Sequence, residues 1–227
     1  MTRAVLFDVD GTLVDSVDAH ARAWAAAFAE AGFPIPIERI RPLIGMGGDR
    51  ILPALIPGAS EDTEPGKTIA ARRAEIFRER ELPGVRPTRG ARELLLAVRA
   101  RSARVVVASS AKKDELDALL ARGDFGPLVD VASTSDDAES SKPAPDIVKA
   151  ALRKACVEAA DAVMVGDTRY DIEAAHRARV PCVALLCGGA DPATLAEAEA
   201  IYRDPAELTD SLNAPPFAWA SASSIAV

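Results

Sequence analysis

The feature that most constrains the fold is an alternation of strand-like and helix-like segments after residue 86. The strand-like segments are short apolar runs rich in Val, at residues 104–109, 129–133, 161–166 and 181–186. Segments with helical periodicity flank them, at residues 88–100, 112–122, 144–155 and 169–178. Such alternation favours a parallel sheet, because each crossover helix returns the chain to the same edge. The sequence therefore predicts an α/β fold with helices on both faces of a parallel sheet.

Residues 15–85 follow a different pattern and are rich in Ala, Glu and Arg. Apolar residues recur at helical spacing, as at Trp24, Phe28, Ile69 and Ile76, and no convincing strand is present. This pattern predicts a helical domain that is inserted between the first strand and the rest of the core.

The domain boundaries follow from these two patterns. We expect a core formed by residues 1–14 and 86–213 and a helical domain at residues 15–85. The last segment, 214–227, is rich in Ala, Ser and Pro, which predicts a loosely held tail. Within it, Phe217 and Trp219 could dock on the core or on a partner.

The N-terminal apolar run ends in two carboxylates, Asp8 and Asp10, which are followed by Gly11. This pattern is typical of a buried strand that ends in a tight turn. Two negative charges in one loop repel each other unless a cation lies between them. Hard divalent ions prefer carboxylate oxygens, so the pair predicts a Mg²⁺ site. The alternative for Asp10 is a plain Asp-Gly turn.

Polar side chains also follow two later predicted strands. Ser109 ends one of them, and its hydroxyl could donate to a phosphate oxygen, although a serine after a strand is also common. A helix from about Lys112 would aim backbone N–H groups at the same place. Asp167 ends the other strand, and Asp171 follows four residues later. These two carboxylates could hold one metal ion or could cap the next helix.

Lys142 stands immediately before Pro143, where a helix is expected to start. A lysine held there could neutralise a phosphoryl group and the Asp8 carboxylate. A solvated lysine in a surface loop is the alternative. Since the carboxyl ends of parallel strands meet at one edge of a sheet, all of these side chains should converge on one pocket.

These four motifs, in this order, resemble those of the haloacid dehalogenase-like phosphatases. The resemblance implies a Rossmann-like core with an α-helical cap domain. It implies that Asp8 is the nucleophile that becomes an aspartyl-phosphate and that Asp10 is the general acid and base. Ser109 and Lys142 would hold the phosphoryl oxygens.

The resemblance also implies a bound Mg²⁺. Its ligands would be Asp8, Asp167 and the backbone carbonyl of Asp10, and Asp171 would belong to the same metal site. The reaction implied is hydrolysis of a small phosphorylated metabolite.

The start of the helical domain, Asp15 to Trp24, resembles the branch that contains β-phosphoglucomutase and phosphoglycolate phosphatases. The two hinges of the cap are then expected near residues 14–16 and 83–87. His20 could contact Asp10 and couple cap closure to the protonation of Asp10. A polar residue on a partly buried helix is the alternative for His20. Trp24 is expected to pack in the core of the cap, and stacking on the substrate is its alternative.

A glycine-rich stretch in the cap is the predicted specificity loop, because in this family such a loop enters the active site. The candidates for substrate contact in it are Gly45, Met46, Gly47, Gly48, Asp49 and Arg50. Arg50 could bind a second anionic group of the substrate or pair with Asp49 or Glu30 on the surface. Ser110 and Lys112, beside Ser109, complete the predicted substrate contacts.

Residues that differ from those of related enzymes favour one reaction of this family over the others. The mutase carries an Arg near the position of Gly48 and a Glu at the position of Gly166, and this chain has neither. True dehalogenases lack the second motif-one carboxylate, which is Asp10 here. We therefore predict a Mg²⁺-dependent phosphatase. A phosphomutase and a catalytically silent binding or regulatory protein remain as alternatives.

Composition limits the other possibilities. The chain has 227 residues, is 49% hydrophobic and 27% charged, and carries a formal net charge of −7. These values are typical of a soluble globular protein and argue against nucleic-acid or anionic-membrane partners. The three cysteines lack metal-ligand spacing and no signal peptide is recognisable, so we expect reduced thiols and a cytoplasmic location. A monomer and a homodimer are both open.

Overall fold

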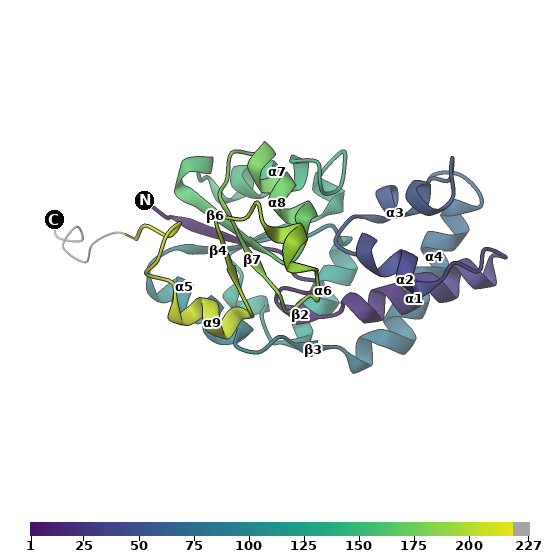
Figure 1. Ribbon diagram of the computed structural model, residues 1–227, viewed down its shortest axis with the longest axis horizontal. Coiled ribbons are helices and arrows are strands. Elements are labelled where there is room, and N and C mark those ends of the chain that lie inside the picture. Colours follow the sequence, from purple (N-terminus) through teal and green to yellow (C-terminus); the bar gives the residue numbers. More distant parts are fainter. Residues whose placement is uncertain (220–227) are drawn as a thin grey trace.

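The computed structural model describes residues 1–219 and is built around a parallel sheet of six strands (Figure 1). Its spatial order is β5-β4-β1-β6-β7-β8, so the first strand of the chain lies between two later ones. The strands are β1 (Ala4–Phe7), β4 (Arg104–Ala108), β5 (Val131–Ser133), β6 (Ala162–Gly166), β7 (Cys182–Leu185) and β8 (Ala200–Tyr202). Because the strand order switches on either side of β1, a crevice opens at the carboxyl ends of the central strands.

Helices cover both faces of the sheet, as the sequence predicts. One face carries α7 (Asp146–Ala155) and α8 (Arg169–Arg177), and the other carries α5 (Ala91–Ala100), α6 (Lys113–Arg122) and α9 (Pro205–Asp210) (Figure 1). Alternate side chains of β1 divide between the two faces: Val5 and Phe7 pack with α5, while Ala4 and Leu6 pack with α7. The prediction of an α/β fold with a parallel sheet is thus confirmed.

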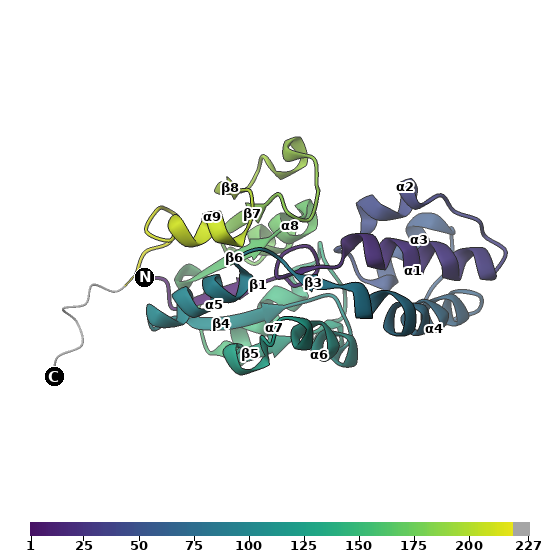
Figure 2. The same cartoon turned by 90° about the horizontal axis from the view of Figure 1, so that it is seen from below.

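Residues 17–84 form a helical insertion at one end of the molecule (Figure 2). Its helices are α1 (Val17–Glu30), α2 (Ile37–Ile40), α3 (Gly48–Leu55) and α4 (Gly66–Ile76), with further helical turns to Gly84. Two short strands, β2 (Val14–Asp15) and β3 (Arg86–Pro87), pair antiparallel where the chain enters and leaves the insertion. The two expected hinge segments therefore lie side by side and join the insertion to the core.

The C-terminal part of the core contains more structure than the sequence suggests. The edge strand β8 and helix α9 have no counterpart among the predicted elements, since β8 has only three residues, none of them buried. Phe217 and Trp219, shortly before Ala220, pack against the core. Phe217 is buried and stacks on Trp219, and the Trp219 indole N–H donates to the Leu212 carbonyl at 2.6 Å. Of the two options left open for these aromatic residues, the structure shows docking on the core, and residues 220–227 of the expected tail lie outside the described part.

No helix within residues 1–219 has both the length and the apolar character that a membrane crossing requires. Cys156, Cys182 and Cys187, all in the described residues, are free thiols.

Candidate active site

The turn after β1 places Asp8 at the carboxyl end of the central strand. The Val9 carbonyl accepts the backbone N–H groups of Leu13 and Val14, both at 2.9 Å, so the chain reverses tightly. Gly11 has a φ of +84°, and a Cβ at this position would lie 2.2 Å from an Asp167 carboxylate oxygen. Glycine is thus required for both its backbone conformation and the close approach of Asp167.

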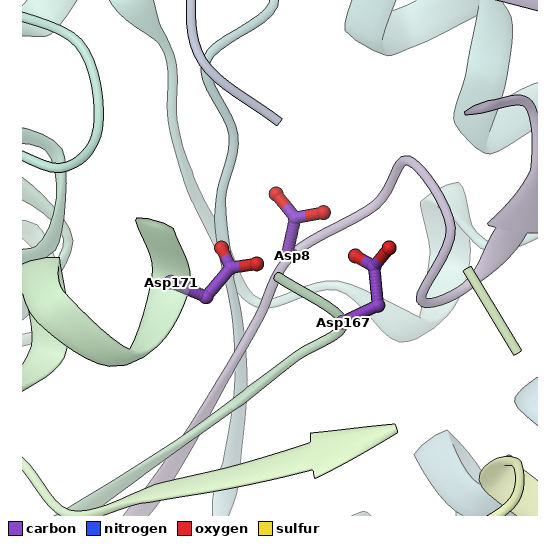
Figure 3. Close-up of side chains that lie close together, drawn as sticks. All are labelled: Asp8, Asp167 and Asp171. Carbon is purple, nitrogen blue, oxygen red and sulfur yellow. The ribbon is translucent and has the colours of Figure 1, made fainter. Parts of the chain in front are cut away.

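Three carboxylates meet at the ends of β1 and β6 (Figure 3). Asp8, Asp167 and Asp171 are all buried, and each offers an oxygen within 4.8 Å of those of the other two. Thr12 donates its hydroxyl to Asp167 at 3.1 Å. Figure 3 shows Asp8 between the other two side chains. The structure therefore brings together the three side-chain ligands that the sequence predicts for a metal.

Helix α8 holds Asp171 in place through its N-terminal cap. Thr168 is the N-cap residue, and Asp171 accepts hydrogen bonds from the Thr168 N–H at 3.0 Å and the Thr168 hydroxyl at 2.6 Å. The Thr168 hydroxyl oxygen in turn accepts the Asp171 N–H at 3.3 Å, and this reciprocal arrangement is a capping box. Thr168, and not Asp167, caps the helix. Asp171 serves the cap with one oxygen and faces the carboxylate cluster with the other.

Lys142 is the buried counter-charge of this cluster. Its side chain is fully inaccessible, and Nζ lies 2.5 Å from Asp8 Oδ1 and 2.7 Å from Asp171 Oδ1. Carboxylates on both sides raise the pKa of Lys142 above its ordinary value despite its burial. The lysine is therefore an ammonium fixed against Asp8, and the alternative of a solvated surface lysine does not apply.

One positive charge does not balance three buried carboxylates. Burial, together with the nearby Asp171 and Asp10 charges, raises the pKa of Asp8 to about 7 even though Lys142 opposes this. Burial and the charges of Asp171 and Asp8 raise the pKa of Asp167 well above its ordinary value. Asp8 Oδ2 is buried and has no hydrogen-bond partner among the described residues. An oxygen-rich, electron-rich site of this kind fits a hard divalent cation.

Asp10 faces away from this cluster, toward the helical insertion. Its Oδ1 accepts the Ser16 hydroxyl at 2.5 Å and lies 2.8 Å from His20 Nε2. His20 is buried and stacks on Phe77, with ring centroids 3.9 Å apart. Burial raises the pKa of Asp10, but His20 and Ser16 outweigh it, so the net shift is downward. Asp8 and Asp10 thus have different hydrogen-bond partners, although both side chains line the same pocket.

Ser109 directly follows Ala108, the last residue of β4, and is fully buried. Its hydroxyl oxygen accepts the Ala111 N–H at 3.1 Å, which leaves the hydroxyl hydrogen to donate elsewhere. Its neighbour Ser110 lines the pocket beside Asp8 and donates to the Gly45 carbonyl at 3.4 Å. This contact joins the end of β4 to the glycine-rich loop of the insertion.

The pocket beside Asp8 and Asp10 lies between the core and the insertion. Four predicted loop residues line it, together with His20 and Ser110: Gly45, Met46, Gly47 and Gly48.

The other predicted contact residues lie outside this pocket. Asp49 accepts the Ser141 N–H at 3.2 Å. Arg50 is 45% exposed, lies 3.6 Å from Asp49 and is not among the lining residues. Lys112 lines only the adjoining groove, where it lies 3.9 Å from Glu61. The arrangement therefore favours the surface pairing considered for Arg50.

Sequence reasoning missed two charged residues that do line the pocket, Arg73 of α4 and Glu115 of α6. Arg73 donates from its guanidinium to the Glu115 carboxylate, so the pair joins the insertion to the core. No sequence signal marked them, because each lies on an amphipathic helix where charged residues usually face solvent. Trp24, which is expected mainly to pack in the cap, also lines the pocket.

The sequence comparisons place these residues in a known context. A family model described as "Haloacid dehalogenase-like hydrolase" matches residues 5–185. A phosphoglycolate phosphatase from Rhodospirillum rubrum is 33% identical over 224 residues, which cover 95% of this chain and 92% of that protein. Protein SUPPRESSOR OF QUENCHING 1 from Arabidopsis thaliana, a chloroplastic protein, is 31% identical over 188 residues, 80% of this chain, which spans only 18% of that protein.

A comparison with solved structures agrees with the sequence match. The crystal structure of a hydrolase from Pseudomonas syringae superimposes with a TM-score of 0.87 at 29% identity, and the match covers 94% of this chain and 98% of that one. The likeness therefore extends over both the core and the insertion. With the family model matching most of its length, this chain belongs to the haloacid dehalogenase-like hydrolases.

Proposed function

We propose that this chain is a Mg²⁺-dependent phosphatase that hydrolyses the monoester of a small phosphorylated metabolite through an aspartyl-phosphate on Asp8. The observation that carries the proposal is the different surroundings of the two oxygens of the Asp8 carboxylate. One oxygen contacts the Lys142 ammonium at 2.5 Å, and the other is buried beside the pocket with no hydrogen-bond partner within residues 1–219. The phosphatase relative from Rhodospirillum rubrum supports the same reaction class.

The chemistry follows from the two carboxylates on the β1 loop. An Asp8 oxygen attacks phosphorus, and the ester oxygen leaves with a proton from Asp10. Water then attacks phosphorus and gives a proton to Asp10, which frees Asp8 and phosphate. His20 Nε2, 2.8 Å from Asp10 Oδ1, can share the proton that Asp10 gives in the first step and regains in the second. Lys142 and Ser109 stabilise the phosphoryl oxygens.

The carboxylate cluster fits the expected metal. Asp8 and Asp167 would hold Mg²⁺ with the Asp10 backbone carbonyl, and Asp171 would support the site. When bound, Mg²⁺ neutralises the charge that would otherwise repel the phosphate dianion from Asp8.

We further propose that the helical insertion acts as a mobile cap, with the division at residues 15 and 85. The paired strands β2 and β3 form a narrow connection about which the insertion can move. Closure brings Gly45–Gly48 over the pocket and excludes water, and opening admits substrate.

Two glycines favour hydrolysis over phosphoryl transfer to a second hydroxyl. A Cβ at Gly166 would lie 2.4 Å from the Asp171 side chain, and one at Gly48 would lie 1.9 Å from Glu61 Oε1. A Glu at position 166 would therefore displace Asp171 of the carboxylate cluster, while an Arg at position 48 would have to move the end of the Glu61 side chain. A cytoplasmic location and a small phosphorylated substrate without nucleic-acid or membrane partners stay predictions, as does the choice between monomer and homodimer.

The proposal is tested with p-nitrophenyl phosphate, whose leaving group needs little help from an acid. Asp8→Asn should abolish turnover with Mg²⁺, because the nucleophile is lost while the volume is kept. Asp10→Asn should still react once and then accumulate one phosphoryl group on Asp8, detectable by mass spectrometry of peptides. Asp62→Asn, an exposed carboxylate in the insertion, is the matched control and should behave as wild type. Undiminished turnover in Asp8→Asn, or phosphate on another residue, would refute the assigned nucleophile.

A further inference from the structure

The pocket beside Asp8 contains a single ion pair that the reaction does not use. Arg73 enters from α4 of the insertion, and Glu115 enters from α6 of the core. Their side chains are only 17% and 14% exposed, and the guanidinium donates directly to the carboxylate. The pair faces the region that the leaving group of a substrate must occupy, since the pocket is bounded on another side by Asp8 and Asp10.

The charges around this pocket disfavour a second anion on the substrate. Among the described residues that line it, Arg73 supplies the one guanidinium or ammonium group. The carboxylates of Asp8, Asp10 and Glu115 line the same space. Since Glu115 already neutralises Arg73, no lining cation is left over for a carboxylate or a second phosphate.

Neutral polar groups, in contrast, find several partners. The Arg73 Nε–H and the Trp24 indole N–H are buried and have no hydrogen-bond acceptor among the described residues. Arg73 is held over the Trp24 ring at 5.2 Å and near the Phe77 ring at 5.8 Å, so the guanidinium is oriented before any substrate binds. A hydroxyl oxygen can accept from these donors, and a hydroxyl hydrogen can donate to Glu115.

From these contacts we infer that the site selects phosphate monoesters whose leaving group is uncharged and hydroxylated, the class of polyol and sugar monophosphates. The inference rests on the proposed phosphatase function and names its substrate class. A leaving group with a carboxylate would have to displace Glu115 from Arg73. That exchange would leave a buried, unpaired carboxylate next to two others, which is strongly unfavourable. Glu115 and Arg73 are thus specificity-determining residues.

The test compares substrates that differ in this one respect. Values of kcat/KM with Mg²⁺ are measured for 2-hydroxyethyl phosphate against 2-phosphoglycolate, and for glycerol 3-phosphate against 3-phosphoglycerate. In each pair a CH₂OH group replaces a carboxylate on a similar skeleton. The wild-type protein should prefer the neutral member of each pair by about tenfold or more, because buried polar groups left unpaired discriminate strongly.

Glu115→Gln keeps an oxygen for Arg73 but removes the charge, so it should cut this preference by about tenfold. Glu93→Gln is the matched control. Glu93 is exposed on α5, lies outside this pocket and the adjoining groove, and undergoes the same change in charge, so the preference should stay as in wild type. Arg73→Gln provides the reverse test: it leaves the Glu115 charge unpaired, and the preference for the neutral member should increase.

Each preference is the ratio of two kcat/KM values measured on the same preparation. A smaller fraction of folded protein lowers both values equally, so the ratio does not change. A wild-type protein that prefers the carboxylate members, together with a Glu115→Gln variant of unchanged ratio, would overturn the inference and leave the phosphatase proposal intact. Failure to hydrolyse all four esters and p-nitrophenyl phosphate would refute both.

Discussion

Asp167 shows how a functional carboxylate can cost stability at the scale of one residue. Burial and two neighbouring carboxylates raise the pKa of Asp167, so its charge is unfavourable unless a cation is bound. We predict that Asp167→Asn, which keeps the volume and the Thr12 contact, unfolds in EDTA at the same temperature as wild type or higher. Wild type should gain about 2.7 kcal/mol of stability at Mg²⁺ a hundred times above its Kd, and the variant should lose this gain.

Thermal unfolding of both proteins, with EDTA and with Mg²⁺, checks this prediction without reference to activity. Asp62→Asn provides the control, because it removes an exposed carboxylate and should keep the full response to Mg²⁺. A variant that is less stable in EDTA and still gains stability from Mg²⁺ would show that Asp167 is a structural residue and not a ligand.

At the scale of elements, the strands that end in functional residues were also the easiest to predict. β1, β4 and β6 are buried, apolar and flanked by turn signals, so Asp8, Ser109 and Asp167 could be placed at their ends from sequence. β8 could not be predicted, because three half-exposed residues carry no clear period. The same limit applies to Arg73 and Glu115, whose meeting depends on how two distant helices pack.

A capped turn after β5 allows a test of pH dependence away from the active site. Asp137 accepts hydrogen bonds from Lys154 at 2.6 Å and from the Thr134 N–H at 3.0 Å, and these lower its pKa below 3.8. A lowered folded-state pKa contributes stability above the unfolded pKa, and this stability is lost as the pH falls through the folded value. Asp137→Asn should therefore cost about 1 kcal/mol at neutral pH. Urea unfolding should show this difference shrinking below about pH 3.8, the ordinary value; a cost that stays constant down to pH 3 would contradict the charge argument.

At the scale of the whole molecule, polar contacts outside the hinge fasten the insertion to the core on more than one element. The Tyr170 hydroxyl donates to the Pro42 carbonyl at 2.9 Å, and Arg41 donates to the Gly188 and Gly189 carbonyls at 3.3 and 3.2 Å. On the opposite side of the pocket, Arg73 pairs with Glu115. None of these contacts is visible in local sequence patterns, because each depends on the angle at which the insertion sits over the sheet.

Tyr170→Phe tests whether these contacts set the balance between closed and open forms. The variant keeps the buried ring and removes the hydroxyl, which donates to Pro42 of the insertion and accepts a hydrogen bond from the neighbouring Arg169 at 3.3 Å. Under the proposed cap motion, the contact with Pro42 would be lost on opening. A loss of about 1 kcal/mol shifts that balance about fivefold toward the open form. We expect kcat/KM to fall by about this factor and amide hydrogen exchange to become faster in residues 41–50, with little change in Tm. Tyr202→Phe, on the edge strand β8, is the matched control and should change neither quantity. If Tyr170→Phe lowers Tm but leaves kcat/KM and exchange in the loop unchanged, the contact stabilises the fold without controlling closure.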